Sequence, residues 1–298
     1  MKKINIVEMA LRDGLQNEKK AVELAKRLAL LDQLIRAGLS RIEIGAFVSP
    51  KWVPQMAVTK DFVEALVKTK SLSPHFSVLV PNSQGMGEAV KFPLKEVSVF
   101  TGATESFVRK NINCSIDESL ARFEPVFAEA RRRKIKVRGY ISVALFCPYE
   151  GKVDPRKVLK IAKKLEAMGA YEISIGDTIG AAVPRDIEKL FQVLKKEIPI
   201  RKLAGHFHDT RGTAVANAWE AYQIGVRVFD SSAGGLGGCP YAPGSGGNVA
   251  TEDLVYFFES MGVKTGVDLE HMLEMQKDIQ AMVGHEMRAR VKVPFSRN

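Results

Sequence analysis

Cysteine is scarce in this sequence, and the few cysteines that occur lie far apart. The 298 residues include only Cys114, Cys147 and Cys239. An odd number of widely spaced cysteines does not make a disulfide framework, so we expect reduced thiols in a cytoplasmic protein. We interpret Cys114 and Cys147 as small buried side chains, because an isolated cysteine usually packs as a hydrophobic residue.

The sequence also lacks long apolar runs, and we expect no N-terminal leader. No stretch approaches the roughly 20 apolar residues that a membrane span requires. The first residues lead directly into a predicted strand and leave no room for a signal or transit peptide. We therefore expect a soluble cytoplasmic protein without a membrane partner.

Nucleic-acid-binding motifs are absent, although the chain is basic. Lysine and arginine number 44 against 34 acidic residues, which gives a formal net charge of +10. Much of the excess lies on amphipathic helices, as in Ala130–Lys134, and this favours a solvated helix face over an anion-binding surface. Without a recognition helix or a zinc finger we expect no nucleic-acid partner, whereas a phosphorylated small molecule is compatible with the charge.

Short apolar strands alternate with longer amphipathic helices along the whole chain. The predicted strands are Lys3–Met9, Arg41–Ala46, Phe76–Val80, Glu96–Phe100, Lys136–Leu145, Tyr171–Gly176, Lys202–His208 and Arg227–Ser231. The predicted helices include Ala21–Ala37, Lys60–Thr69, Ile116–Arg133, Pro155–Met168, Pro184–Lys196, Ala214–Ile224, Thr251–Met261 and Leu269–Arg288.

This alternation favours one fold over its main alternative. Eight strands that alternate with helical segments in 298 residues predict an α/β fold of the TIM barrel type rather than an open doubly wound sheet. No linker divides the chain. We therefore predict a single catalytic domain over residues 1–298, with residues 262–298 as a C-terminal helical extension.

Two histidines end the seventh predicted strand. Because strand side chains alternate between faces, His206 and His208 point the same way. Two imidazoles on one face make half of a metal site. The structural alternative is that one histidine packs in the core and the other caps a loop, so other residues must decide between the two.

Polar residues also end several of the other predicted strands. In a TIM barrel the functional groups lie at the carboxyl ends of the strands, so these residues can be considered as a set. The candidate site residues are Arg12, Asp13, Glu43, Asp177, His206, His208, Cys239 and Asn248. Scattered salt bridges would explain one or two of them, but not the convergence of all of them on one rim.

Part of this set suits a divalent cation. A mixture of nitrogen and oxygen donors fits six-coordinate Mg²⁺ or Mn²⁺ better than a closed zinc site built of thiolates. A carboxylate such as Asp177 or Glu43 would not bind the cation itself but would orient its ligands through hydrogen bonds. The predicted metal ligands are Asp13, His206, His208 and Asn248.

Each candidate also has a structural interpretation. Arg12 and Asp13 could form a surface ion pair, and Glu43 could balance the nearby Arg41. Cys239 lies in a glycine-rich segment, where glycine permits backbone conformations closed to other residues. That segment is either a loop that moves over a ligand or a flexible connector.

Six motifs resemble those of the 3-hydroxy-3-methylglutaryl-coenzyme A lyases. They are Arg12–Glu18 (RDGLQNE), Phe47–Met56 (FVSPKWVPQM), Asn111–Ser115 (NINCS), Gly205–Thr210 (GHFHDT), Gly235–Gly244 (GLGGCPYAPG) and Gly247–Leu254 (GNVATEDL). The resemblance extends from about Val7 to about Leu273. It is specific, because related isopropylmalate and homocitrate synthases share the Arg-Asp start and the His-x-His but not Gln16-Asn17 or the cysteine of the glycine loop.

The resemblance implies a metal-assisted retro-Claisen cleavage of 3-hydroxy-3-methylglutaryl-CoA to acetoacetate and acetyl-CoA. Asp13 or a neighbouring histidine would take the hydroxyl proton, and the residues leave this choice open. Arg12 would stabilise the oxygen of the departing thioester enolate. Cys239 would return a proton to the enolate carbon, with His206 as a candidate relay.

Two other functions are compatible with part of these features. A condensing synthase of the same superfamily would join acetyl-CoA to a 2-oxo acid, and a non-enzymatic basic protein would bind polyanions without a metal. The complete set of rim residues favours the lyase, whose partner is a small acyl-CoA substrate.

The resemblance and the extra C-terminal helices also favour a homodimer. Departures from the family pattern at Ala10-Leu11, Ile44–Ala46 and Arg211 leave every candidate ligand in place.

Overall fold

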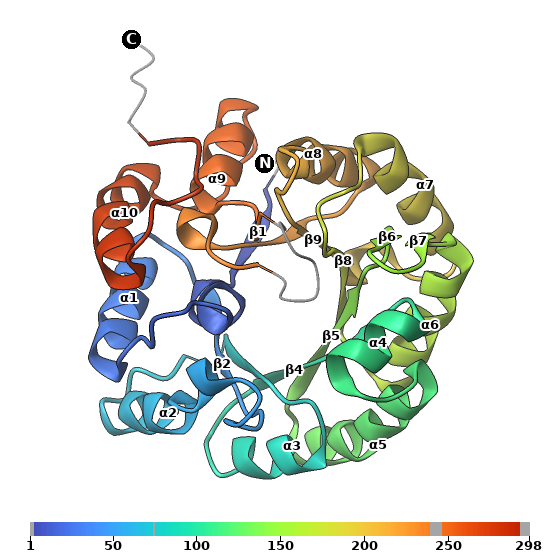
Figure 1. The fold of residues 1–298 in the computed structure, drawn as a ribbon, viewed down its shortest axis with the longest axis horizontal. Coiled ribbons are helices and arrows are strands. Elements are labelled where there is room, and N and C mark those ends of the chain that lie inside the picture. Colours follow the sequence, from blue (N-terminus) through green and yellow to red (C-terminus); the bar gives the residue numbers. More distant parts are fainter. Residues whose placement is uncertain (1–2, 74, 239–245, 293–298) are drawn as a thin grey trace.

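The computed structural model describes residues 3–73, 75–238 and 246–292, and its centre is a closed barrel of eight parallel strands. Figure 1 looks into this barrel and shows helices surrounding it on all sides. The strands neighbour one another in the order β1, β10, β9, β8, β5, β4, β3, β2. The predicted TIM barrel is confirmed. The barrel strands are β1 (Asn5–Glu8), β2 (Arg41–Ala46), β3 (Phe76–Leu79), β4 (Glu96–Gly102), β5 (Lys136–Ser142), β8 (Glu172–Asp177), β9 (Leu203–Phe207) and β10 (Val228–Ser231).

The helices lie on the outside of the barrel, and most of them follow a strand directly. They are α1 (Leu24–Arg36), α2 (Thr59–Lys68), α3 (Ser83–Ala89), α4 (Glu105–Ile112), α5 (Ile116–Arg133), α6 (Pro155–Met168), α7 (Pro184–Leu194), α8 (Ala214–Ile224), α9 (Thr251–Ser260) and α10 (Leu269–Val283). Their apolar faces pack on the barrel and bury the main hydrophobic core. None of the helices in the described ranges combines the length and hydropathy that a membrane-spanning segment requires.

The predicted bounds differ from the observed ones chiefly at the last predicted helix. We expected it to extend to Arg288, but α10 ends at Val283, where Gly284 takes a left-handed conformation with φ of 84°. That conformation terminates a helix, and the backbone leaves it there. Residues 285–292 instead run back along the chain's glycine-rich segment, where the amides of Arg288 and Ala289 donate to the Gly234 carbonyl at 2.9 and 3.2 Å.

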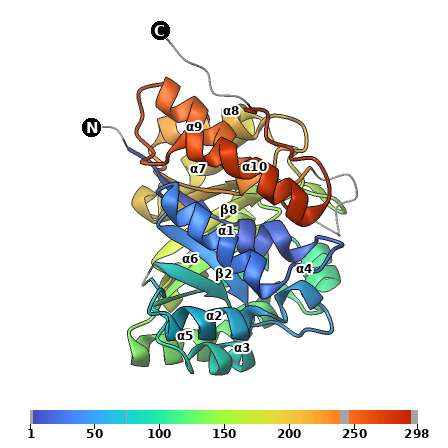
Figure 2. The same ribbon diagram turned by 90° about the vertical axis from the view of Figure 1, so that its left-hand side faces the viewer.

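Helix α10 packs beside α1 and α9, as the neighbouring blue and red helices of Figure 2 show. The amide of Asp268, just before α10, donates to the Ala37 carbonyl at the end of α1 at 2.8 Å. The start of α10 is therefore tied to the end of α1. This packing supports our proposal of a single domain in which the C-terminal helical region is an extension of the barrel.

Short elements were not predicted. Helices α3 and α4 and the antiparallel hairpin of β6 (Phe146–Cys147) and β7 (Gly151–Lys152) add to the predicted pattern. Directly after β1, residues Ala10–Gly14 form a single π-helical turn, which was not among the predicted elements. A π-turn inserts an extra residue into the helical repeat and is frequent at functional sites.

Strand β9 depends on a glycine that leaves room for an aromatic ring. A Cβ atom on Gly205 would lie 2.7 Å from the ring of Phe207 and 3.2 Å from that of Phe229. We expect Gly205→Ala to lower the free energy of unfolding by about 1–3 kcal/mol, because the extra methyl group overpacks this region. Chemical denaturation would measure the change.

The matched control is Gly87→Ala in α3, where no atom lies within 4 Å of the added Cβ. Alanine there should raise the stability by about 0.5–1 kcal/mol, because glycine loses more backbone freedom on folding. Equal effects at the two positions would contradict the packing argument for Gly205.

Candidate active site and metal-binding cluster

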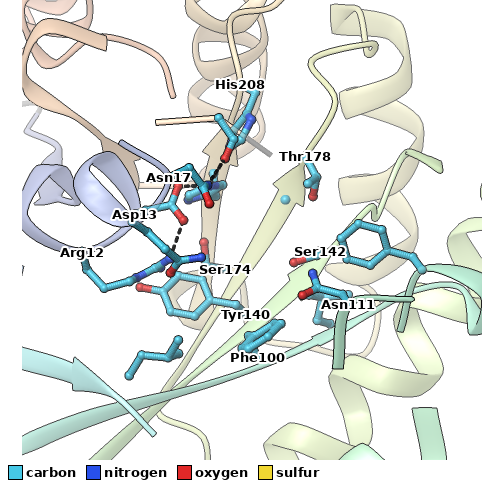
Figure 3. Close-up of a pocket in the computed structure, with 17 residues that line it drawn as sticks. Arg12, Asp13, Asn17, Phe100, Asn111, Tyr140, Ser142, Ser174, Thr178 and His208 are labelled. Atoms are coloured by element: carbon cyan, nitrogen blue, oxygen red, sulfur yellow. Dashed lines mark hydrogen bonds and ion pairs between the residues drawn. The ribbon is translucent and has the colours of Figure 1, made fainter. Parts of the chain in front are cut away.

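A cavity opens at the carboxyl ends of the barrel strands, where functional groups of this fold gather. Figure 3 shows that Arg12 and Asp13 reach it from the turn after β1, Tyr140 from β5, and His208 from the end of β9. Phe100 and Phe107 contribute apolar surface to the same cavity. It therefore combines a charged end with a less polar wall.

Asp13, His206 and His208 form a cluster at the charged end. One possible ligand atom from each residue lies within 4.8 Å of those of the other two. The Nε2 atoms of the two histidines are 3.3 Å apart, and His206 Nε2 lies 3.9 Å from Asp13 Oδ2. The predicted convergence of both histidines on one face is confirmed. The cluster is a possible metal-binding triad.

Asn248 lies beside this cluster. It pairs with His208 in an isolated β-bridge, and its side-chain nitrogen donates to Asp13 Oδ2 at 2.8 Å and to the Leu236 carbonyl at 3.0 Å. Both contacts engage the amide nitrogen of Asn248. The amide oxygen is therefore the atom that would bind a cation through its lone pair. The fourth predicted ligand is therefore next to the other three.

The charges of the cluster suit metal ligation. Burial alone would raise the pKa of Asp13, but the Arg12 guanidinium and the two imidazoles hold this pKa at about 2. Burial and, to a smaller extent, the neighbouring His206 lower the pKa of His208 to about 3. At neutral pH the site thus offers a carboxylate and an uncharged imidazole, the protonation states that metal ligands need.

Arg12 is held between two carboxylates. It forms ion pairs with Asp13 and Glu43, and its side chain is only 8% exposed. The interpretation of Arg12 and Asp13 as a surface ion pair is therefore wrong. Burial opposes the charge, but Glu43 and Asp13 keep the pKa of Arg12 above its ordinary value.

Glu43 fixes Arg12 rather than Arg41. It is fully buried and also accepts hydrogen bonds from Ser98 Oγ at 2.6 Å and from the Tyr140 hydroxyl at 3.0 Å. Arg41 pairs instead with Glu172 at 2.9 Å. Glu43 therefore orients Arg12, the candidate catalytic arginine, rather than a predicted metal ligand.

Asp177 is placed differently from our expectation. Its carboxylate accepts hydrogen bonds from the backbone amides of Ala181 and Ala182 at 3.2 and 2.9 Å, in the loop between β8 and α7. These contacts organise that loop, and the structure gives Asp177 no side-chain contact with the cluster within the described ranges. The residue that touches a cluster histidine from behind is Asp230 of β10, which the sequence analysis did not single out.

The cysteines divide into two groups. Cys114 and Cys147 are buried with free thiols, which confirms their interpretation as small packed side chains. Cys239 lies outside the described residues. The segment before it reaches the cavity, since Gly238 lines the cavity and its carbonyl accepts a hydrogen bond from Asn17 Nδ2 at 2.7 Å.

A family model described as HMGL-like matches residues 3–279. The chain belongs to the HMGL-like family. Among the curated relatives of this HMGL-like chain, the hydroxymethylglutaryl-CoA lyase of Pseudomonas mevalonii is 49% identical and the match covers 97% of this chain and 96% of the relative. The mitochondrial hydroxymethylglutaryl-CoA lyase of Rattus norvegicus is 52% identical over 92% of this chain and 83% of its own length.

The comparison with solved structures points to the same family as the comparison of sequences. The crystal structure of hydroxymethylglutaryl-CoA lyase from Pseudomonas aeruginosa has a TM-score of 0.93 and 46% identity, and the match covers 98% of this chain and 96% of that one. The family resemblance inferred from the motifs is confirmed for the HMGL-like chain. Its fold is the fold of those lyases.

Proposed function

We propose that this HMGL-like chain is a lyase that cleaves (S)-3-hydroxy-3-methylglutaryl-CoA to acetoacetate and acetyl-CoA. The observation that carries the proposal is the Asp13–His206–His208 cluster beside a buried Arg12, at the catalytic rim of the barrel. Hydroxymethylglutaryl-CoA lyases that are about half identical to this chain over nearly its whole length support the choice of substrate.

We also propose that Asp13, His206, His208 and Asn248 hold a divalent cation, Mg²⁺ or Mn²⁺. The converging donor atoms and their protonation states fit such an ion, and among the described residues no thiolate belongs to the cluster. When bound, the cation would supply Lewis-acid polarisation of the substrate's oxygens and fix the substrate in place. Asp13 or a neighbouring histidine would accept the proton of the tertiary hydroxyl group.

Arg12 would act on the departing half of the substrate. Its guanidinium is held in one orientation by Glu43 and stays cationic, so its donors are already in place for the negative charge that develops on the enolate oxygen. Cys239 is our candidate for the proton donor to the enolate carbon, with His206 as the relay.

Cleavage by chelator-treated protein, with and without added Mg²⁺ or Mn²⁺, tests the reaction and the metal together. We expect acetoacetate formation to disappear on chelation and to return with metal. Cys239→Ser and His206→Ala should lose it. The matched controls Cys114→Ser, at a buried cysteine that does not line the cavity, and His75→Ala, at an exposed histidine, should keep it.

One result would contradict the lyase proposal directly. If the metal-loaded protein leaves hydroxymethylglutaryl-CoA intact and consumes acetyl-CoA only when a 2-oxo acid is added, the chain is a condensing synthase.

We further propose that the protein is cytoplasmic and that it forms a homodimer. Light scattering would detect the homodimer as a particle of about twice the 32.9 kDa chain mass.

A further inference from the structure

We propose that Asp230 is a positioning residue that orients the His206 imidazole toward the metal-binding cluster. This inference rests on the proposed function, since it concerns a ligand of the proposed cation. Asp230 is 1% exposed and lies beside His206 in the register of β10 and β9. Its Oδ2 atom is 3.1 Å from His206 Nδ1, on the side of the ring opposite to Nε2.

The carboxylate of Asp230 is itself held rigidly. Arg138 donates to both of its oxygens, at 2.8 Å from Nη2 to Oδ1 and at 3.1 Å from Nη1 to Oδ2. The hydroxyl group of Ser174 donates to Oδ2 at 2.7 Å. A two-point contact of this kind fixes the plane of a carboxylate as well as its position.

This arrangement determines how His206 presents its two nitrogens. A carboxylate that is paired with a buried arginine accepts hydrogen bonds and donates none, so Nδ1 of His206 must carry the hydrogen. In the uncharged ring, the form that binds a metal ion, Nε2 is then the nitrogen without a hydrogen, and it faces His208 Nε2 at 3.3 Å. The lone pair of His206 is thereby directed into the cluster.

The position of the ion pair supports a role beyond stability. Arg138 and Asp230 lie inside the barrel, a region that branched apolar side chains usually fill. Burying two charges costs solvation free energy, and a well-packed apolar pair is often at least as stable. An aspartate that must reach a metal-ligating histidine explains why a charged pair is found here.

Metal affinity, measured without substrate, tests the proposal. Asp230→Ala should weaken the binding of Mn²⁺ by about 10–100-fold, as loss of the partner behind a ligand typically does. The electron paramagnetic resonance signal of free Mn²⁺ reports this affinity directly.

The matched control is Glu172→Gln. Glu172 is the other carboxylate that holds Arg138, at 2.7 Å from its Nε, but its hydrogen bonds and ion pairs are with arginines and not with His206. It should keep the wild-type affinity for Mn²⁺. An equal loss of affinity in both variants would mean that Asp230 acts only as a partner of Arg138, and this result would overturn the proposal.

If Asp230→Ala alone does not fold, the double variant Arg138→Met/Asp230→Ala also removes the buried cation that has lost one of its two carboxylates, and it should show the same loss of affinity. The wild type offers an independent measurement, because the chain has only five histidines and their ¹⁵N resonances can be separated. Without metal, the uncharged ring of His206 should carry its hydrogen on Nδ1, and an uncharged ring with its hydrogen on Nε2 would overturn the proposal. Failure of the wild type to bind Mn²⁺ would count against the metal site itself, which keeps the two proposals distinguishable.

Discussion

Arg12→Met should lower kcat for the cleavage of hydroxymethylglutaryl-CoA by about 10²–10³-fold, the cost of losing one preorganised donor to a developing oxyanion. The loss should fall on kcat more than on KM, because negative charge reaches the thioester oxygen only as the carbon–carbon bond breaks. Steady-state kinetics at saturating metal would measure both constants.

The ion pairs of Arg12 make a control necessary. Removing the arginine leaves the buried Glu43 carboxylate without its cation, and breaking such a pair costs about 3–5 kcal/mol of stability. The double variant Arg12→Met/Glu43→Gln relieves that charge, so we expect it to regain stability while its kcat stays low. A double variant with the wild-type kcat would show that Arg12 has only a structural role.

A second arginine provides a matched comparison. Arg41 is also partly buried and paired with a carboxylate, Glu172, but it does not line the cavity among the described residues. Arg41→Met should therefore lower stability without changing kcat. This comparison separates the loss of a charge pair from the loss of a catalytic donor.

Local signals in the sequence were sufficient for the regular elements of the barrel. Helix α5 begins after Ser115, whose side chain and that of Glu118 form a capping box, and the predicted bounds of this helix are the observed ones. Helix α6 begins at Pro155 after the capping Asp154 and ends before Gly169. These start and stop signals are local, so no knowledge of the tertiary structure was needed.

The elements that were missed lack such signals or depend on distant contacts. Helix α3 has only seven residues, and β6 and β7 are two residues each. The π-turn at Ala10–Gly14 is buried against the glycine-rich segment, where a Cβ atom on Gly14 would lie 2.8 Å from Ser232 Oγ. Contacts between residues more than 200 positions apart cannot be obtained from a local pattern.

The candidate site was predictable at the strand ends but not inside the barrel. His206, His208, Asp13 and Arg12 follow from the rule that functional groups lie at the carboxyl ends of strands. Asp230 lies within β10, and its contact with His206 depends on the register between β10 and β9. That register, with inward and outward residues alternating along each strand, is the signal that could have distinguished Asp230 from Asp177.

Glu252, at the start of α9, should dominate the pH dependence of the free energy of unfolding between its pKa in the unfolded chain and its pKa in the folded protein. It is fully buried, and its carboxylate accepts hydrogen bonds from the Gly234 amide at 3.0 Å and from Gln276 Nε2 at 3.2 Å. Burial, with a contribution from the negative charge of Glu8, raises the pKa of Glu252 to about 8. In an unfolded chain the pKa of a glutamate is about 4.3.

The sign of the effect follows from these two values. Between them the folded protein binds a proton that the unfolded chain has released, so the free energy of unfolding falls as the pH rises. The stabilising contribution is complete below the unfolded pKa and is lost as the pH approaches 8. Each pH unit within the range costs at most about 1.36 kcal/mol.

Glu252→Gln should abolish this dependence, because glutamine keeps the acceptor oxygen for Gly234 and does not titrate. The stability of the variant relative to the wild type should therefore increase by about 2–3 kcal/mol between pH 5.5 and pH 7.5. Urea unfolding of both proteins at each pH gives the difference in the free energy of unfolding, in which the contributions of titrating groups common to both proteins cancel.

Glu188→Gln on the exposed face of α7 is the control and should show no such trend. A difference for Glu252→Gln that is independent of pH would mean that Glu252 is ionised in the folded protein, with the amide of Gly234 and the side chain of Gln276 stabilising the buried charge.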